Sequence, residues 1–216
     1  MNCHCQGIET QFDEREAAWK LADYRRSGPA RTTRILLDAL MDAGVQGLTL
    51  LDIGGGVGAI PHALLTAGVR SATSVDASSA YLAAARSEAE RQGHADRVRA
   101  YHGDFVALAD ELAPADIVTL DRVICCYPDM PALVGRSAAK AARLYGLVYP
   151  RDTWWITAGV AVVNRLFWLQ RTPFRIFAHR SAAVDAVVRR SGLAPRFTRT
   201  TALWQIVVYA RESALP

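Results

Sequence analysis

The sequence is poor in the residues and segments that mark specialised protein classes. Its 216 residues include only four cysteines, in two close pairs, Cys3/Cys5 and Cys125/Cys126. Such pairs do not resemble a framework of spaced disulfides, and a chain of this length buries roughly two-thirds of its unfolded surface without one. Cys3-His4-Cys5 offers three soft ligands, but no second cluster follows at zinc-finger spacing. We therefore expect no metal site.

A strong charge of one sign is also missing. The 25 lysines and arginines are nearly balanced by 21 aspartates and glutamates, and the net charge of +4 is spread without a long run. Nucleic-acid binding is therefore permitted but not indicated. Only Lys20 and Lys140 are lysines, so the positive charge is mostly arginine, which suits planar recognition of carboxylate or phosphate, although codon bias gives the same excess. Met1 to Gln11 contain no basic segment followed by an apolar one, which predicts a cytoplasmic protein.

No apolar run is long enough to predict a membrane span. The most apolar stretch, Thr153 to Leu169, falls short of a spanning helix and is interrupted by Asn164 and Arg165. We expect this stretch to form a helix that lines or caps an apolar pocket. Packing into the core and a helix lying on a membrane surface are the alternatives, and stable membrane insertion is not expected.

What the chain does contain is an alternation of apolar strands and helices. Short apolar runs predict strands at 47–53, 71–75, 97–101, 116–120 and 144–149. Helices are expected at 57–67, 78–92 and 130–142, and two more over 9–43 with a break at Ser27-Gly28-Pro29. This order predicts right-handed βαβ crossovers and a parallel sheet. The last two strands, 195–201 and 204–211, are too close for a crossover and should form an antiparallel hairpin.

The residues with the clearest chemical meaning follow the first predicted strand. The segment Leu51-Asp52-Ile53-Gly54-Gly55-Gly56-Val57-Gly58-Ala59 is a strand, a glycine loop and the start of a helix, where a ligand can approach free backbone N–H groups. Gly54, Gly56 and Ala59 also satisfy the dinucleotide pattern G-x-G-x-x-G/A. The glycines alone therefore do not show whether the ligand is a dinucleotide.

Three carboxylates narrow the choice. Asp52, two residues before the first glycine, would repel a pyrophosphate but hold an ammonium group. Asp76, at the end of the second strand, is placed to bind two ribose hydroxyls. Asp104, in Gly103-Asp104-Phe105 after the third strand, offers an acceptor for an exocyclic amine beside an aromatic face. Together they describe S-adenosylmethionine (SAM), although Asp76 or Asp104 could instead cap the following helix.

This ordered set of motifs resembles the class I SAM-dependent methyltransferases. Asp52-x-Gly54-x-Gly56-x-Gly58, Asp76, Gly103-Asp104-Phe105 and Leu120-Asp121-Arg122 carry the resemblance, which covers about residues 30–211. It implies a Rossmann-like three-layer αβα sandwich with a seven-stranded sheet of order 3-2-1-4-5-7-6 and strand 7 antiparallel. It also implies SAM as cofactor and S-adenosylhomocysteine (SAH) as product. The layout is loosely similar to that of magnesium-protoporphyrin and ubiquinone-pathway O-methyltransferases.

The resemblance also implies roles for single residues. Gly54, Gly56 and Gly58 would border the methionine and ribose, Asp76 would bind the ribose hydroxyls, and Asp104 and Phe105 would contact the adenine. Asp121 and Arg122 follow the strand that presents the methyl-accepting side. Tyr24, in Tyr24-Arg25-Arg26, lies on a helix that would fold over the cofactor and reach the methionine carboxylate. The implied cofactor-binding set is Asp52, Gly54, Gly56, Gly58, Asp76, Ala77, Asp104, Phe105, Asp121, Arg122 and Tyr24.

We interpret residues 1–216 as a single methyltransferase domain. Residues 1–45 would form an N-terminal helical extension or lid, and 46–150 the SAM-binding core. Residues 151–180 would supply a substrate-pocket helix and loop, and 181–216 the last helix and the C-terminal hairpin. The expected assembly is a monomer or a homodimer.

The acceptor is expected to be a small molecule. Methyl transfer is an in-line displacement, so a general base is needed only if the acceptor loses a proton. His179, Asp121 and Tyr127 are the catalytic candidates, with Tyr149 and Asp152 as further possible bases. The segment after the fourth strand departs from the Asp/Asn-Pro-Pro-aromatic pattern of nucleic-acid amino methyltransferases, so no nucleic-acid partner is expected.

The composition of residues 150–180 suggests O-methylation of a partly apolar, anionic acceptor. Aromatic residues there could cover its body while arginines clamp a carboxylate. These residues are Trp154, Trp155, Phe167 and Trp168, with Arg151, Arg165, Arg171, Arg175 and Arg180. The alternatives are a SAM-binding regulatory protein without catalysis and an NAD(P)-dependent reductase.

Overall fold

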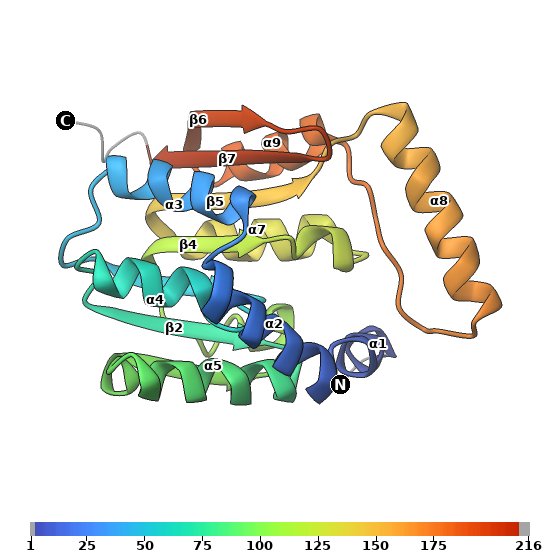
Figure 1. Cartoon of the computed structure of the whole chain (residues 1–216). Coiled ribbons are helices and arrows are strands. Elements are labelled where there is room, and N and C mark those ends of the chain that lie inside the picture. The colour runs from blue at the N-terminus through green and yellow to red at the C-terminus, as the bar shows by residue number, and fades with distance from the viewer. Residues whose placement is uncertain (1–2, 212–216) are drawn as a thin grey trace.

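The fold is built on one seven-stranded sheet. The computed structural model describes the backbone of residues 3–211 and the side chains of residues 7–211. The strands are β1 (Thr49–Ile53), β2 (Ser71–Asp76), β3 (Val98–His102), β4 (Ala115–Asp121), β5 (Ala141–Pro150), β6 (Leu193–Thr200) and β7 (Trp204–Arg211). Their order is β3-β2-β1-β4-β5-β7-β6, with β7 antiparallel to both neighbours (Figure 1). The predicted topology, including the terminal hairpin, is confirmed.

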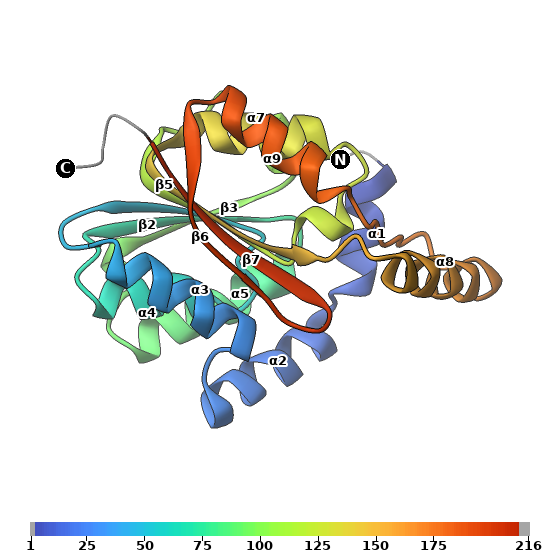
Figure 2. The ribbon, with the colours of Figure 1, turned by 90° about the horizontal axis from the view of Figure 1, so that it is seen from above.

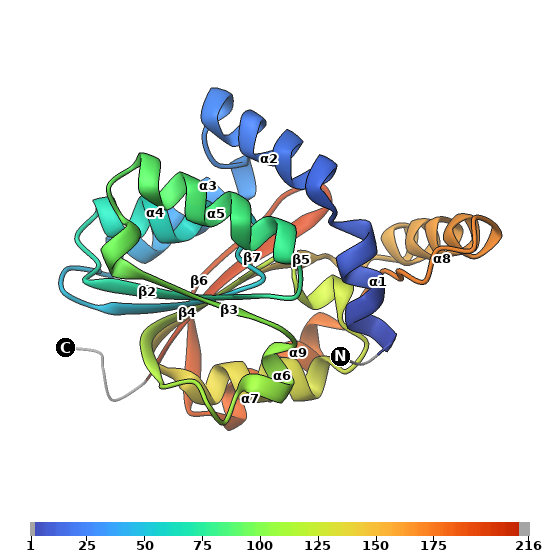
Figure 3. The same cartoon turned by 90° about the horizontal axis from the view of Figure 1, so that it is seen from below.

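Helices cover both faces of the sheet and make the sandwich three layers thick. One face carries α3 (Arg31–Asp42), α4 (Ala59–Thr66) and α5 (Ser79–Arg91), and the other carries α6 (Phe105–Leu108), α7 (Met130–Lys140) and α9 (Ser181–Arg190) (Figures 2 and 3). Leu36 and Leu64 are buried in the core on the first face, and Leu133 and Val184 in the core on the second. The helix α3, within the segment expected to be an extension, therefore belongs to the core.

The N-terminal segment forms one helix more than the two expected over residues 9–43. The described part contains α1 (Cys3–Gln11) and α2 (Glu14–Ser27) before α3. The Asp13 carboxylate accepts a hydrogen bond from the backbone N–H of Glu16 at 2.9 Å, which caps α2 and starts a new helix after α1. The predicted break at Ser27-Gly28-Pro29 is present, with Gly28 at a φ of +71°.

The most apolar stretch forms α8 (Trp154–Leu169), which projects from the body of the molecule (Figures 1 and 2). Residues 170–180, which we call the strap, run back along α8 to the start of α9. The Asn164 side-chain amide ties the two, donating to the carbonyl of Ile176 at 2.7 Å and accepting from its N–H at 2.9 Å. None of the helices in the described part of the chain combines the length and the hydrophobicity that a membrane span requires.

Candidate functional site

The glycine loop between β1 and α4 is shaped by close contacts. Gly54 has a φ of +65°, and a Cβ atom there would lie 2.5 Å from Cγ2 of Val123. A Cβ atom at Gly55 would lie 2.5 Å from Oδ2 of Asp52. Both positions therefore exclude larger residues. Gly58, with a φ of +83°, precedes the first turn of α4 and positions the helix.

Asp52 is a buried carboxylate with one unsatisfied oxygen. Asp52 is the penultimate residue of β1 and is 1% exposed, and its Oδ1 accepts the hydroxyl hydrogen of Thr119 at 2.6 Å. Oδ2 has no hydrogen-bond partner among the described residues. Burial raises the pKa of Asp52 to about 8, against the hydrogen bond from Thr119. A buried polar atom of this kind calls for a donor or cation from a ligand.

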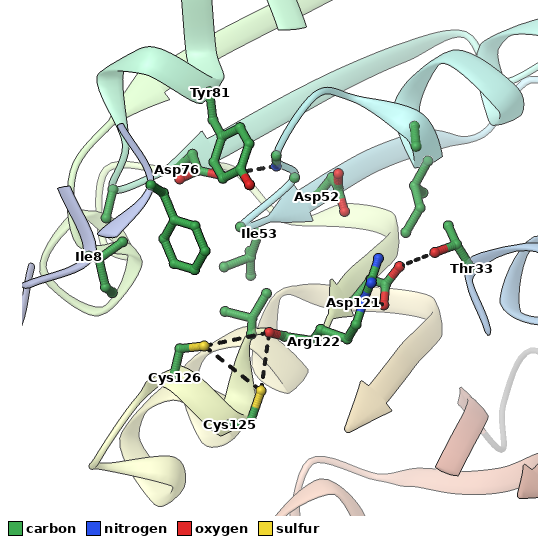
Figure 4. Close-up of a pocket in the computed structure, with 18 of the residues that line it drawn as sticks. Ile8, Thr33, Asp52, Ile53, Asp76, Tyr81, Asp121, Arg122, Cys125 and Cys126 are labelled. Carbon is green, nitrogen blue, oxygen red and sulfur yellow. Dashed lines mark hydrogen bonds and ion pairs between the residues drawn. The ribbon is translucent and has the colours of Figure 1, made fainter. Parts of the chain in front are cut away.

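Asp76 lies at the carboxyl end of β2, across the glycine loop from Asp52 (Figure 4). Its Oδ2 accepts the N–H of Gly56 at 3.0 Å, and its Oδ1 accepts the N–H of Ser78 at 2.9 Å. Burial raises its pKa, against these two hydrogen bonds. Because a carboxylate has about four acceptor positions, Asp76 keeps capacity for two hydroxyl donors.

Asp104 and Tyr127 form a pair at the third strand end. Asp104 caps α6 by accepting the N–H of Val106 at 3.0 Å, as the alternative interpretation allowed. The Tyr127 hydroxyl donates to the same carboxylate, 3.1 Å from each oxygen. Phe105 is buried beside them. Tyr127 therefore lies in the site but directs its hydroxyl hydrogen at Asp104.

The end of β4 brings together Asp121, Arg122 and a residue from the N-terminal helices. Asp121 accepts the hydroxyl of Thr33 at Oδ2 and the Nε–H of Arg122 at Oδ1, the latter at 3.1 Å. Arg122 has a φ of +61°, which turns the chain sharply after the strand. Thr33 belongs to α3 and was not anticipated, since a threonine in a helix gives no signal of such a contact.

These residues surround one cavity of about 600 Å³, in the size range of small-ligand sites. Every predicted cofactor-binding residue lines it except Gly58. The cavity also has walls that the sequence interpretation missed, mainly from α1, α2 and the strap. These are Ile8, Phe12, Lys20, Phe174 and Ile176. Lys20 and Tyr24 are four residues apart and share one face of α2, so this pairing was available from helical spacing.

His179 does not line the cavity. Its Nε2 lies 3.1 Å from the carbonyl oxygen of Ile124 and 3.0 Å from that of Tyr127, and its ring stacks on Phe177. It therefore holds the segment 124–127 in place. Tyr149 and Asp152 also lie outside the lining, and Asp152 accepts hydrogen bonds from the N–H and hydroxyl of Ser181.

The aromatic and arginine residues expected to enclose the acceptor do not line the cavity either. Only Ile156 and Val160 of α8 face it, so the expectation that this helix lines an apolar pocket is right for these two residues. The expectation is wrong for Trp154, Trp155, Phe167 and Trp168, and for Arg151, Arg165, Arg171, Arg175 and Arg180. The helix is apolar around most of its circumference, so periodicity did not indicate which side faces inward.

The described side chains contain no cluster of three or more histidine, cysteine or carboxylate groups that could hold a metal ion. The side chains of Cys3, His4 and Cys5, considered as soft ligands above, lie outside the described residues. Cys125 and Cys126 line the cavity, with their sulfurs 3.8 Å apart. The hydrogen bond with Cys126, with burial, raises the pKa of Cys125, and the same bond lowers that of Cys126.

Residues 50–143 match the family model described as a methyltransferase domain. This part of the chain is a methyltransferase domain. The unsatisfied Asp52 oxygen, the glycine loop and Asp76 fit SAM, which supplies an electrophilic methyl group on sulfur. The NAD(P)-dependent reductase allowed by glycine spacing is thereby set aside.

Solved structures of methyltransferases share the fold. A magnesium protoporphyrin IX methyltransferase from Synechocystis PCC 6803 with bound SAH gives a TM-score of 0.73 at 19% identity, covering 97% of this chain and 100% of the other. An O-methyltransferase family protein from Burkholderia thailandensis gives 0.68 at 18% identity, over 92% of this chain and 60% of the other. A SAM-dependent methyltransferase from Mesorhizobium loti gives a TM-score of 0.66 at 16% identity, covering 84% of this chain and 99% of the other. A search of curated proteins found no match.

Proposed function

We propose that this methyltransferase domain transfers the methyl group of SAM to a carboxylate oxygen of a small, partly apolar acceptor, forming a methyl ester. The observation that carries the proposal is a cavity wall that is largely apolar and whose described side chains include two cations and no histidine. The apolar part is formed by Ile156, Val160, Phe174 and Ile176. Such a wall suits the body of an acceptor with a hydrocarbon or aromatic frame.

The groups around the cavity favour an acceptor that needs no deprotonation. No described histidine lines the cavity, and both oxygens of Asp121 already accept hydrogen bonds. Tyr127 donates to Asp104. A carboxylate is already ionised at neutral pH and attacks without a general base, whereas a phenol or an ammonium must lose a proton.

Two cations in the lining support binding of anionic groups. Lys20 reaches the cavity from α2, and Arg122 reaches it from the end of β4. In the proposal, these two cations bind the anionic groups, the role that the sequence analysis gave to the arginines of residues 150–180. Two carboxylates need such partners in this cavity, one on the methionine part of SAM and one on the acceptor.

For SAM itself, we propose the contacts implied by the family resemblance. Asp76, with Ala77, binds the ribose hydroxyls, and Asp104 with Phe105 contacts the adenine. Asp52 holds the ammonium group, directly or through water. Tyr24 joins Lys20 at the methionine carboxylate, since both lie on the same face of α2.

The test is a transfer assay with SAM labelled on its methyl group and a panel of aromatic and aliphatic acids, phenols and amines. Methyl esters release labelled methanol in alkali, whereas methyl ethers and N-methyl products do not. We expect alkali-labile product from an apolar acid. Label that is transferred only to alkali-stable product would contradict a carboxylate acceptor.

The Asp76→Ala variant controls for the cofactor site. Loss of its charge-assisted hydrogen bonds should weaken SAM binding by about 2 kcal/mol, measured by calorimetry. Circular dichroism would confirm that the variant is folded. Unchanged SAM affinity in a folded variant would contradict the ribose contact without bearing on the acceptor.

A further inference from the structure

The outer face of α8 is an unusually large exposed apolar surface. The described residues include ten exposed large hydrophobic side chains, and six of them lie on this one helix. Trp154 is 82% exposed. The six, which we call the outer apolar face, are Trp154, Trp155, Val162, Leu166, Trp168 and Leu169. Contiguous apolar surface of this kind marks an interaction site.

The outer apolar face is held in a fixed orientation. Ile156 is buried and Val160 faces the cavity, so the inner side of α8 is already used. The two hydrogen bonds between Asn164 and Ile176 fasten the helix to the strap, and Phe167 packs edge-on against Phe174 with ring centroids 5.8 Å apart. Figures 1 and 2 show the helix projecting beyond the end of the sheet. The apolar side chains therefore point away from the domain.

The charged residues of α8 and the strap are all arginines. Between Thr153 and Val184 the sequence contains no aspartate or glutamate and four arginines: Arg165, Arg171, Arg175 and Arg180. Arg165 and Arg171 are exposed, and the Arg165 guanidinium lies 4.4 Å from the centroid of the Trp168 ring. A surface that combines exposed tryptophan with arginine complements a partner that is apolar inside and anionic at its boundary.

We infer that α8 docks on the surface of an anionic lipid bilayer. Tryptophan rings prefer the boundary between lipid headgroups and acyl chains, and arginines near them attract anionic headgroups. A helix of 16 residues is too short to span a bilayer, so it lies in the interface with its outer face inserted. A second copy of the chain is a poorer occupant, because it would bring arginines together with no carboxylate in the segment to pair them.

Vesicle flotation of the whole protein tests the inference. We expect binding to phosphatidylcholine vesicles that contain phosphatidylglycerol, weaker binding to phosphatidylcholine alone, and loss at high salt. The double variant Trp154→Ser/Trp168→Ser should bind anionic vesicles about tenfold or more weakly. Arg165→Gln and Arg171→Gln should each weaken binding about fivefold.

Trp19→Ser is the matched control. Trp19 lies on α2 and is 56% exposed, as Trp168 is, so its loss should leave vesicle binding unchanged. None of the substituted residues lines the cavity, so SAM affinity should be retained and would report on folding. The inference is overturned if the double variant floats like the parent, if anionic lipid makes no difference, or if sedimentation shows a dimer that these substitutions dissociate.

Discussion

Asp52 combines two properties that bear on ligand binding. Its Oδ2 is buried without a partner among the described residues, and its pKa is raised to about 8 by burial. Near pH 7 the free protein therefore holds a proton on this carboxyl group. The proposed ammonium contact requires the ionised form, so SAM binding should release that proton.

The prediction is that SAM affinity increases from pH 6 to pH 7.5, by up to about tenfold for each pH unit. Below a pKa of about 8 only a fraction of the protein has the competent carboxylate, and that fraction grows as the pH rises. Calorimetry in buffers of different ionisation enthalpy would measure both affinity and proton release. Asp52→Asn keeps an oxygen for the Thr119 hydroxyl and should abolish the pH dependence; a wild-type affinity that is flat over this range would contradict the assignment.

At the scale of elements, one ion pair joins the helix α2 to the domain. Glu88 of α5 is fully buried, and its carboxylate accepts the Nε–H of Arg25 at 2.8 Å and hydrogen bonds from Arg91 and Gln92. These hydrogen bonds lower the pKa of Glu88 to about 2, and the bond from Arg91 has the largest effect. Because Tyr24 and Lys20 of α2 line the cavity, this pair also positions them.

We predict that Arg25→Ala destabilises the protein by about 1 kcal/mol and weakens SAM binding. Glu88 keeps Arg91 and Gln92, so the loss is only partial. The Glu88 contribution is present above its ordinary pKa near 4.5 and is lost as the pH falls through about 2, so the difference between parent and variant should shrink in acid. Urea unfolding of the parent and the variant, at neutral and at acid pH, measures this difference in stability.

Arg26→Ala is the neighbouring control. Arg26 pairs with Asp23 within α2 in an exposed position, and exposed pairs contribute little. An Arg25→Ala protein as stable as the Arg26→Ala protein would show that the Glu88 contact does not anchor α2.

Sequence patterns predicted the sheet far better than the helices around the cavity. The strand ends carry Asp52, Asp76 and Asp104 at fixed points of a parallel sheet, so order along the chain determines position in space. The helices α1, α2 and α8 lie outside this frame, and their inward faces depend on tertiary contacts such as Asn164 with Ile176. For that reason the tryptophans of α8 were placed on the wrong side, whereas Lys20 could have been found from its spacing to Tyr24.

The structure also changes the expected boundary between the N-terminal extension and the core. The segment 1–45 was expected to be an extension, yet Leu36 and Leu40 of α3 are fully buried against the sheet. The cavity wall outside the core includes residues of α1, α2 and the strap. The cytoplasmic location, the absence of a nucleic-acid partner and the oligomeric state stay predictions.

On the scale of the whole molecule, two segments that are far apart in the sequence meet in the wall of the cavity. Phe12, at the end of α1, meets Phe174 of the strap edge-on with ring centroids 5.6 Å apart, and both line the cavity. Phe174→Ala should speed SAH dissociation about twofold to twelvefold, because an aromatic pair of this geometry contributes about 0.5–1.5 kcal/mol. Stopped-flow displacement measures the rate, and Phe177→Ala, outside the lining, should leave it unchanged. Equal rates in the parent and Phe174→Ala would rule out this contact as a barrier to exit.

The link between α8 and the strap then has a consequence for turnover. The Asn164–Ile176 hydrogen bonds connect the projecting helix to the segment that carries Phe174, two residues away. Each catalytic cycle must exchange SAH for SAM, and a slow opening step of this kind limits the rate of many enzymes. We therefore expect anything that restrains α8 to change how fast product leaves, while the transfer of the methyl group itself proceeds as before.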